Sequence, residues 1–69
     1  MEDHVYKLTE VVGTSHESSD DAIRQALARA AKSIRNIRWF EVIANRGFLD
    51  QGGKVQYQVT LKIGFNLED

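Results

Sequence analysis

Apolar and polar side chains alternate strictly near the end of the chain, and no other feature constrains the fold as tightly. From 55 to 67 the odd positions are apolar or aromatic: Val55, Tyr57, Val59, Leu61, Ile63, Phe65 and Leu67. The even positions are Gln56, Gln58, Thr60, Lys62, Gly64 and Asn66. A period of two places neighbouring side chains on opposite faces of a β-strand. The pattern therefore predicts a long strand, Val55 to Leu67, in a sheet with one buried face.

A second strand, Trp39 to Asp50, precedes this strand, and Gln51-Gly52-Gly53 supplies the turn. A two-residue Gly52-Gly53 loop is a favoured hairpin connection, and it fixes the register. The resulting pairs all face the buried side: Phe48 with Tyr57, Ala44 with Leu61, Val42 with Ile63 and Phe40 with Phe65. The same register sets Trp39 opposite Asn66 and places Arg46 on the buried side.

The first half of the chain predicts a strand followed by a helix. The strand runs from His4 to Val12 and ends at Gly13-Thr14-Ser15. Ser18 is the expected N-cap of the helix, with Asp21 as a capping-box partner. We expect Lys32 and Arg35 in the last helical turn and a left-handed stop at Asn36. The apolar stripe at helical spacing consists of Ile23, Ala26, Leu27, Ala30 and Ile34.

These elements predict an α+β fold of order β-α-β-β, with a three-stranded antiparallel sheet and one helix, in a single domain over residues 1–69. One helix covers only one face of such a sheet. The second face exposes Trp39, Ile43 and Leu49 among polar groups, which is typical of an interface or a ligand site. The residues alone leave two interpretations open. Trp39 either fills a subunit contact, or it is a platform for a flat ligand whose edge Gln58 binds.

Composition narrows the possible functions. The chain has no cysteine, which excludes disulfides and thiolate metal sites, and its two histidines are too far apart to predict a metal site. A net charge of −1 argues against nucleic-acid and membrane partners. The start, MEDHVYKLTE, lacks the pattern of a signal peptide, so we expect a cytoplasmic protein. A 69-residue chain buries little surface, which favours association with further copies of itself.

No motif supports catalysis. Gly13-Thr14-Ser15 precedes a helix, but it lacks the spacing and the lysine of a phosphate-binding loop. His16 stands beside Glu17 without a nucleophile in a suitable pattern, and no acid–base pair of carboxylates is evident. We therefore expect a protein that is not an enzyme.

Four segments together resemble one family across almost the whole chain: Val11-Val12-Gly13-Thr14-Ser15, Trp39-Phe40-Glu41-Val42, Arg46-Gly47, and Tyr57 to Phe65. They resemble the dodecins, small flavin-binding proteins that assemble as hollow dodecamers. The resemblance implies a homododecamer that stores, buffers or photoprotects FMN or riboflavin by stacking it between tryptophans at a two-fold axis. A structural shell, or an interaction protein whose tryptophan serves only assembly, is the alternative.

The resemblance also implies roles for individual residues. Trp39 matches the stacking tryptophan, Gln58 matches the glutamine that binds the flavin's pyrimidine edge, and Arg46 matches an arginine used by members that hold FMN. Some relatives bind coenzyme A, and the residues at roughly matching places are Tyr6, Arg29 and Lys32.

Asn66 departs from the family pattern. Bacterial members commonly have arginine there, near the cofactor's phosphate. Asparagine cannot provide the charged, bidentate grip of a guanidinium on phosphate. The departure puts selectivity for the phosphate in doubt, and it favours riboflavin or a weaker complex with FMN.

Overall fold

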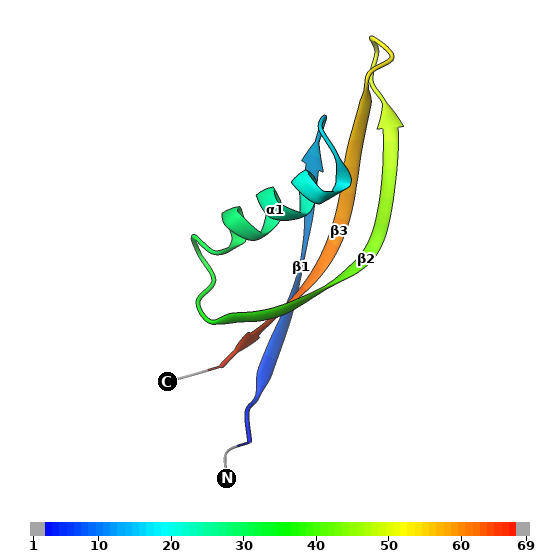
Figure 1. The fold of residues 1–69 in the computed structure, drawn as a ribbon. Coiled ribbons are helices and arrows are strands. Elements are labelled where there is room, and N and C mark those ends of the chain that lie inside the picture. The colour runs from blue at the N-terminus through cyan, green and yellow to red at the C-terminus, as the bar shows by residue number, and fades with distance from the viewer. Residues whose placement is uncertain (1–2, 68–69) are drawn as a thin grey trace.

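The computed structural model describes residues 3–67 and has four elements. These are strand β1 (Tyr6–Ser15), helix α1 (Ser19–Ala30), strand β2 (Ile37–Leu49) and strand β3 (Val55–Asn66). The sheet is antiparallel with the order β1-β3-β2, so β3 is the central strand. Figure 1 shows α1 lying across one face of the sheet, while the β2–β3 hairpin extends past the helix. The predicted β-α-β-β fold of one helix and three antiparallel strands is confirmed.

The core lies between α1 and the central strand. Val59, Leu61 and Ile63 of β3 are fully buried. The helix packs on them through small side chains, the buried residues Ala22, Ala26 and Ala30, while Ile23, Leu27 and Ile34 are partly buried around them. A side chain at Gly13 would collide with the backbone of Ala22, so the glycine allows the helix to approach β1 closely. The predicted apolar stripe therefore faces the sheet, but it is centred on the alanines.

The helix begins as predicted and ends earlier. The Ser18 hydroxyl accepts a hydrogen bond from the Asp21 backbone N–H at 3.0 Å, which confirms the N-cap. The capping box is wrong, because the Asp21 carboxylate instead accepts bonds from the Ser15 hydroxyl and the Gln25 amide, both at 2.7 Å. The helix ends at Ala30, so Lys32 lies beyond its last turn.

Two other element boundaries also differ from the prediction. Asn36 does adopt the left-handed conformation, with φ 62°, but it stands just before β2 rather than at the helix end. Arg35, next to it, is likewise outside the helix. Strand β1 continues through Ser15, because Gly13 and the two residues after it pair with the central strand.

The hairpin turn is longer than predicted. Asp50 and Lys54 close a three-residue loop, with the Asp50 N–H donating to the Lys54 carbonyl at 2.9 Å. Gly53 is left-handed, with φ 81°, and its N–H donates to the Asp50 carbonyl at 2.9 Å. The Asp50 carboxylate also accepts from the backbone N–H groups of Gly52 and Lys54. This arrangement is a type I turn followed by a bulge, and its third residue replaces the predicted two-residue loop.

The longer turn shifts the register, so the predicted strand pairs are wrong. Near the turn Phe48 pairs with Gln56 and Ala44 with Thr60, which moves both to the face away from the helix. An irregularity between Val42 and Ala44 then restores the predicted side for the start of β2. Val42 pairs with Leu61 and Phe40 with Ile63, both on the helix side.

Candidate functional site

The open face is the face of the sheet that α1 does not cover, and Trp39 lies on it. Trp39 pairs with Gly64 of the central strand, and its indole ring reaches across β3 so that a side chain at Gly64 would overlap three ring atoms. Trp39 as a residue is 40% exposed. Leu8 of β1 pairs with Gly64 from the other side and is also exposed. The row Leu8–Gly64–Trp39 therefore presents apolar groups on an open surface.

Gln58 and Arg46 form a second feature of the open face. They are cross-strand partners, and an Nη1–H of Arg46 donates to Oε1 of Gln58 at 3.1 Å. The prediction that Arg46 faces the helix is wrong, because the three-residue turn places it opposite Gln58. A guanidinium only donates, so the Gln58 oxygen faces it and the Gln58 NH₂ group stays available as a donor. The pair offers several hydrogen-bond donors to solvent.

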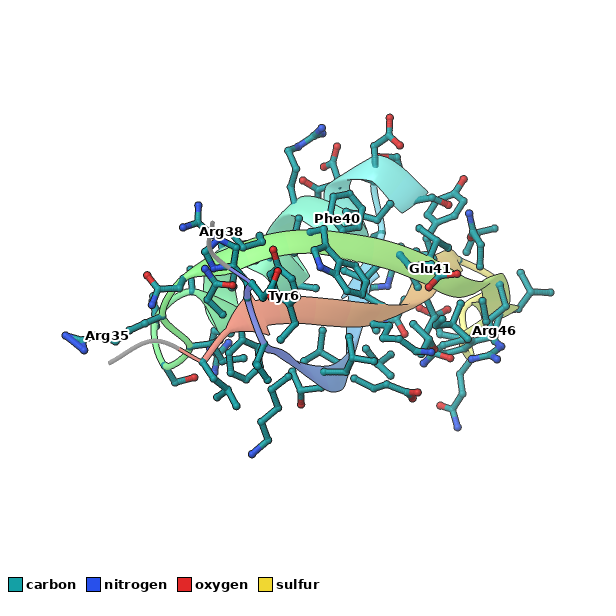
Figure 2. The ribbon with its side chains drawn as sticks, turned by 90° about the horizontal axis from the view of Figure 1, so that it is seen from below. Tyr6, Arg35, Arg38, Phe40, Glu41 and Arg46 are labelled. Atoms are coloured by element: carbon teal, nitrogen blue, oxygen red, sulfur yellow. The ribbon has the colours of Figure 1, made fainter. Side chains whose placement is uncertain are left out.

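The two features are well separated within one protomer. Gly64, beneath the indole, lies six residues along β3 from Gln58, which corresponds to about 20 Å of strand. Figure 2 shows Arg38 and Arg46 toward opposite ends of β2, with Phe40 and Glu41 between them. One protomer therefore does not bring Trp39 and Gln58 against the same small ring system.

Asn66 does not lie where the register predicted. Its partner is Tyr6 of β1, whereas Trp39 pairs with Gly64. Asn66 is 6% exposed, and its Oδ1 atom is buried without a hydrogen-bond partner. The residue lines a hollow of about 360 Å³ with Ser33, Ile34, Arg35, Asn36, Phe65 and Leu67. The amide is thus buried at the end of the sheet and offers little surface to a ligand.

The structure does not group the three residues implicated in coenzyme A binding. Tyr6 lies on the open face near the start of β1. Arg29, near the end of α1, lines a hollow of about 170 Å³ to which both α1 and β1 contribute. On β1 the hollow lies at Val12–Thr14, toward the end of the strand that is opposite to Tyr6. Lys32 follows the helix, and its backbone N–H donates to the Arg29 carbonyl.

Strand β2 is exposed on both faces. The helix packs against β1 and β3, so it leaves Phe40 and Val42 on the helix side of β2 45% and 43% exposed. Trp39 and Phe48 on the open face are exposed to a similar extent. This strand therefore presents two apolar surfaces that the protomer itself does not cover.

Gly64 is the residue of this site that the sequence prediction missed. The alternation of the last strand predicts only that Gly64 lies on the polar face. In the structure, the indole of Trp39 occupies the space that a side chain at Gly64 would need. A glycine inside a long alternating strand is itself a signal of close approach by another group. Nothing in the local pattern indicates which side chain makes that approach.

The described part of the chain contains neither a metal-binding cluster nor a helix that could span a membrane. Among residues 3–67, no three His, Cys, Asp or Glu side chains gather as a metal site. Over the same range, no helix is long and apolar enough to cross a membrane.

Known proteins match the chain over nearly its full length. The model of the Dodecin family matches residues 5–68. A dodecin of Thermus thermophilus is 51% identical over 65 residues, covering 94% of each chain. A protein named calcium dodecin, from Mycobacterium tuberculosis, is 35% identical over 63 residues, or 91% of this chain and 89% of that protein.

Solved structures agree with the sequence matches. The dodecin of Streptomyces davaonensis has a TM-score of 0.91 to this structure at 44% identity, and the match covers 99% of this chain and 100% of that chain. The family model matches most of the chain, relatives are highly identical to it, and solved structures share its three-stranded fold. This protein therefore belongs to the dodecin family.

Proposed function

We propose that this protein binds a flavin, FMN or riboflavin, by stacking the isoalloxazine ring on Trp39. The observation that carries the proposal is the indole held over Gly64 on an open sheet face, with 40% of the residue exposed. A large aromatic ring that no element of its own protomer covers is suited to stack on a second flat ring. The site would store or buffer the flavin.

Gln58 and Arg46 supply the chemistry for the ring's polar edge. The pyrimidine part of a flavin carries two carbonyl oxygens on either side of an N–H. The free NH₂ of Gln58 donates to one carbonyl, and the second lone pair of its Oε1 accepts from the ring N–H. Arg46, already bonded to Oε1, holds the amide in the orientation that this needs.

The complete site requires a second protomer. About 20 Å of strand separates the Trp39 row from Gln58, so a ring stacked on one protomer's indole meets the glutamine of another. The protomer also exposes 5137 Å², against roughly 4,400 Å² for a compact monomer of this mass. We propose that copies of the chain cover β2 on both faces and close into a homododecamer, as the resemblance to the dodecins implies.

The proposed role is binding and not catalysis. A flavin enclosed between tryptophans at a two-fold axis has no open face for a substrate. Contact with an electron-donating indole would instead quench the excited ring and protect it from photochemistry. We propose that this takes place in the cytoplasm. Coenzyme A binding by Tyr6, Arg29 and Lys32 would need side chains of more than one protomer, since Tyr6 and Arg29 lie toward opposite ends of β1.

The test is a titration of Trp39→Ala with riboflavin and FMN beside light scattering of the same samples. Stacking on an aromatic ring contributes roughly 1–3 kcal/mol per base, so the affinity should fall about tenfold or more while the oligomer persists. Leu49→Ala is the control, since Leu49 is an exposed apolar residue of the same strand at the hairpin end. Unchanged flavin binding in Trp39→Ala would refute the platform. Parallel loss of assembly and binding would favour the alternative, a shell protein whose tryptophan serves only assembly.

A further inference from the structure

We propose that Gly64 is a positioning residue for the Trp39 platform, and that its missing side chain sets how close to the sheet the indole lies. The inference rests on the proposed flavin function and adds a residue that would never touch the flavin. Gly64 is buried beneath the indole in the central strand. It would act on the ligand only through Trp39.

The geometry leaves no room for another residue at this position. A β-carbon at Gly64 would overlap Cε2, Cζ2 and Nε1 of the indole, closer than real side chains pack. The atoms that would be displaced belong to a rigid ring, so the collision cannot be relieved by bending a flexible chain end. The backbone at Gly64 does not have a positive φ, in contrast to Gly53. The requirement for glycine at 64 is therefore steric, and it comes from the indole.

Displacement of the ring would reach the ligand directly. Leu8 and Trp39 flank Gly64 in one cross-strand row, so the indole can move only away from the sheet or along it. Either movement alters the height and tilt of the surface on which the flavin stacks. Dispersion contacts weaken steeply with gaps of less than 1 Å, so a tilted platform loses much of its attraction. We expect Gly64→Ala to weaken riboflavin binding about tenfold.

The experiment compares Gly64→Ala with Gly47→Ala as the matched control. Gly47 is also a strand glycine without a positive φ, but a β-carbon there would make only ordinary contacts, 3.5 Å to the Gln56 carbonyl oxygen and 3.8 Å to Val55 Cγ1. Trp39 is the single tryptophan of the chain, so near-ultraviolet circular dichroism in the tryptophan band and tryptophan emission of the flavin-free protein report its position. We expect both spectra to change in Gly64→Ala and not in Gly47→Ala. A merely structural role for Gly64 would lower stability without changing these spectra.

Each outcome separates the inference from the proposed function. If wild type binds riboflavin and Gly64→Ala binds it equally well, the inference is overturned and the flavin function stands. If wild type binds no flavin, the function fails, and the Trp39 spectra alone decide whether Gly64 positions the indole. If Gly64→Ala does not assemble, Trp39→Phe is added to it. Recovery of assembly with the smaller ring would attribute the failure to the indole, and no recovery would overturn the inference.

Discussion

Strands β2 and β3 are partners in one hairpin and nearly equal in length, yet their apolar side chains are buried to very different extents. The central strand β3 has three side chains, those of Val59, Leu61 and Ile63, at 0% exposure. The edge strand β2 is just as apolar, yet apart from the partly buried Ile37 its large apolar side chains stay 40% exposed or more. Position in the sheet makes the difference, because α1 covers β1 and β3 and stops short of β2.

The contrast shows that apolar character alone does not determine burial. β3 uses its apolar side chains to form the core of the protomer. β2 leaves its own on surfaces that the protomer does not cover, which is typical of an interface or a ligand site. Substitutions in the two strands should therefore affect different properties, and the predictions below test this division from the largest effect to the smallest.

The largest contrast is expected between two residues that are direct cross-strand partners, Leu61 and Val42. Leu61→Ala empties part of the core and should lower the free energy of unfolding by about 2–5 kcal/mol. Val42→Ala should leave the protomer folded but shift the assembly toward smaller species on dilution. Urea unfolding and light scattering at two protein concentrations measure both effects. Equal destabilisation by the two variants at every concentration would contradict the division of roles between β3 and β2.

A second prediction concerns the phosphate of FMN. Asn66 is neutral and buried, so wild type should bind FMN and riboflavin with similar affinity. Asn66→Arg should raise the affinity for FMN alone, by about tenfold, because hydrogen bonds to charged groups exceed neutral ones by about 1.4 kcal/mol. The gain should be larger at low salt than at high salt. Titration of both flavins at two ionic strengths measures this. A hundredfold preference of wild type for FMN would assign the phosphate to another cation, with Arg46 and Arg38 the first to test.

The open face of β3 allows a smaller and sharper test. Gln58→Leu removes hydrogen bonds to the flavin edge and should weaken binding about fivefold, since one such bond contributes about 1 kcal/mol. Gln56→Leu is the control, because it is the same substitution two residues away on the same face. Stability should change little in either variant. If Gln56→Leu weakens riboflavin binding as much as Gln58→Leu does, the assignment of the polar edge is wrong.

The smallest expected effect is on stability, and it concerns the Asp21 carboxylate in the first turn of α1, the helix that covers β3. Hydrogen bonds from Ser15 and then from Gln25 lower the pKa of Asp21 below its ordinary value of 3.8. The folded state therefore favours the charged carboxylate, whose contribution is present above pH 3.8 and lost as the pH falls through the lowered pKa. Asp21→Asn should be less stable than wild type at neutral pH, and the difference should vanish in acid. Thermal melts from pH 7 to pH 2 test this, with Asp20→Asn as the control. A constant difference across that range would contradict the prediction.

Much of the fold follows from local pattern. Alternation from Val55 onward and the cap at Ser18 identify the central strand and the helix start, because each depends on neighbouring residues. The pairing register of β2 and β3 could not be predicted from local pattern, since it depends on the length of one turn. The residues Asp50 to Gly53 do carry a type I signal, aspartate first and glycine fourth, which the glycine pair obscured.

The site was predictable in its parts and not in its arrangement. Trp39 and Gln58 lie on one face, as expected, because the central strand alternates and the early part of β2 keeps its predicted side. Arg46 was placed wrongly, because it lies between the turn, which reverses the face of the nearby residues of β2, and the irregularity after Val42, which restores it. The close approach of the indole to Gly64 and the burial of Asn66 depend on three-dimensional packing that a linear pattern does not encode.

Fluorescence of bound riboflavin tests the central claim, that the flavin stacks on Trp39, most directly. An indole in contact with the excited ring donates an electron and quenches its emission, whereas phenylalanine does not. We predict that riboflavin is almost dark when bound to wild type and bright when bound to Trp39→Phe at saturating protein. Bound riboflavin of equal brightness in the two proteins would contradict stacking on Trp39.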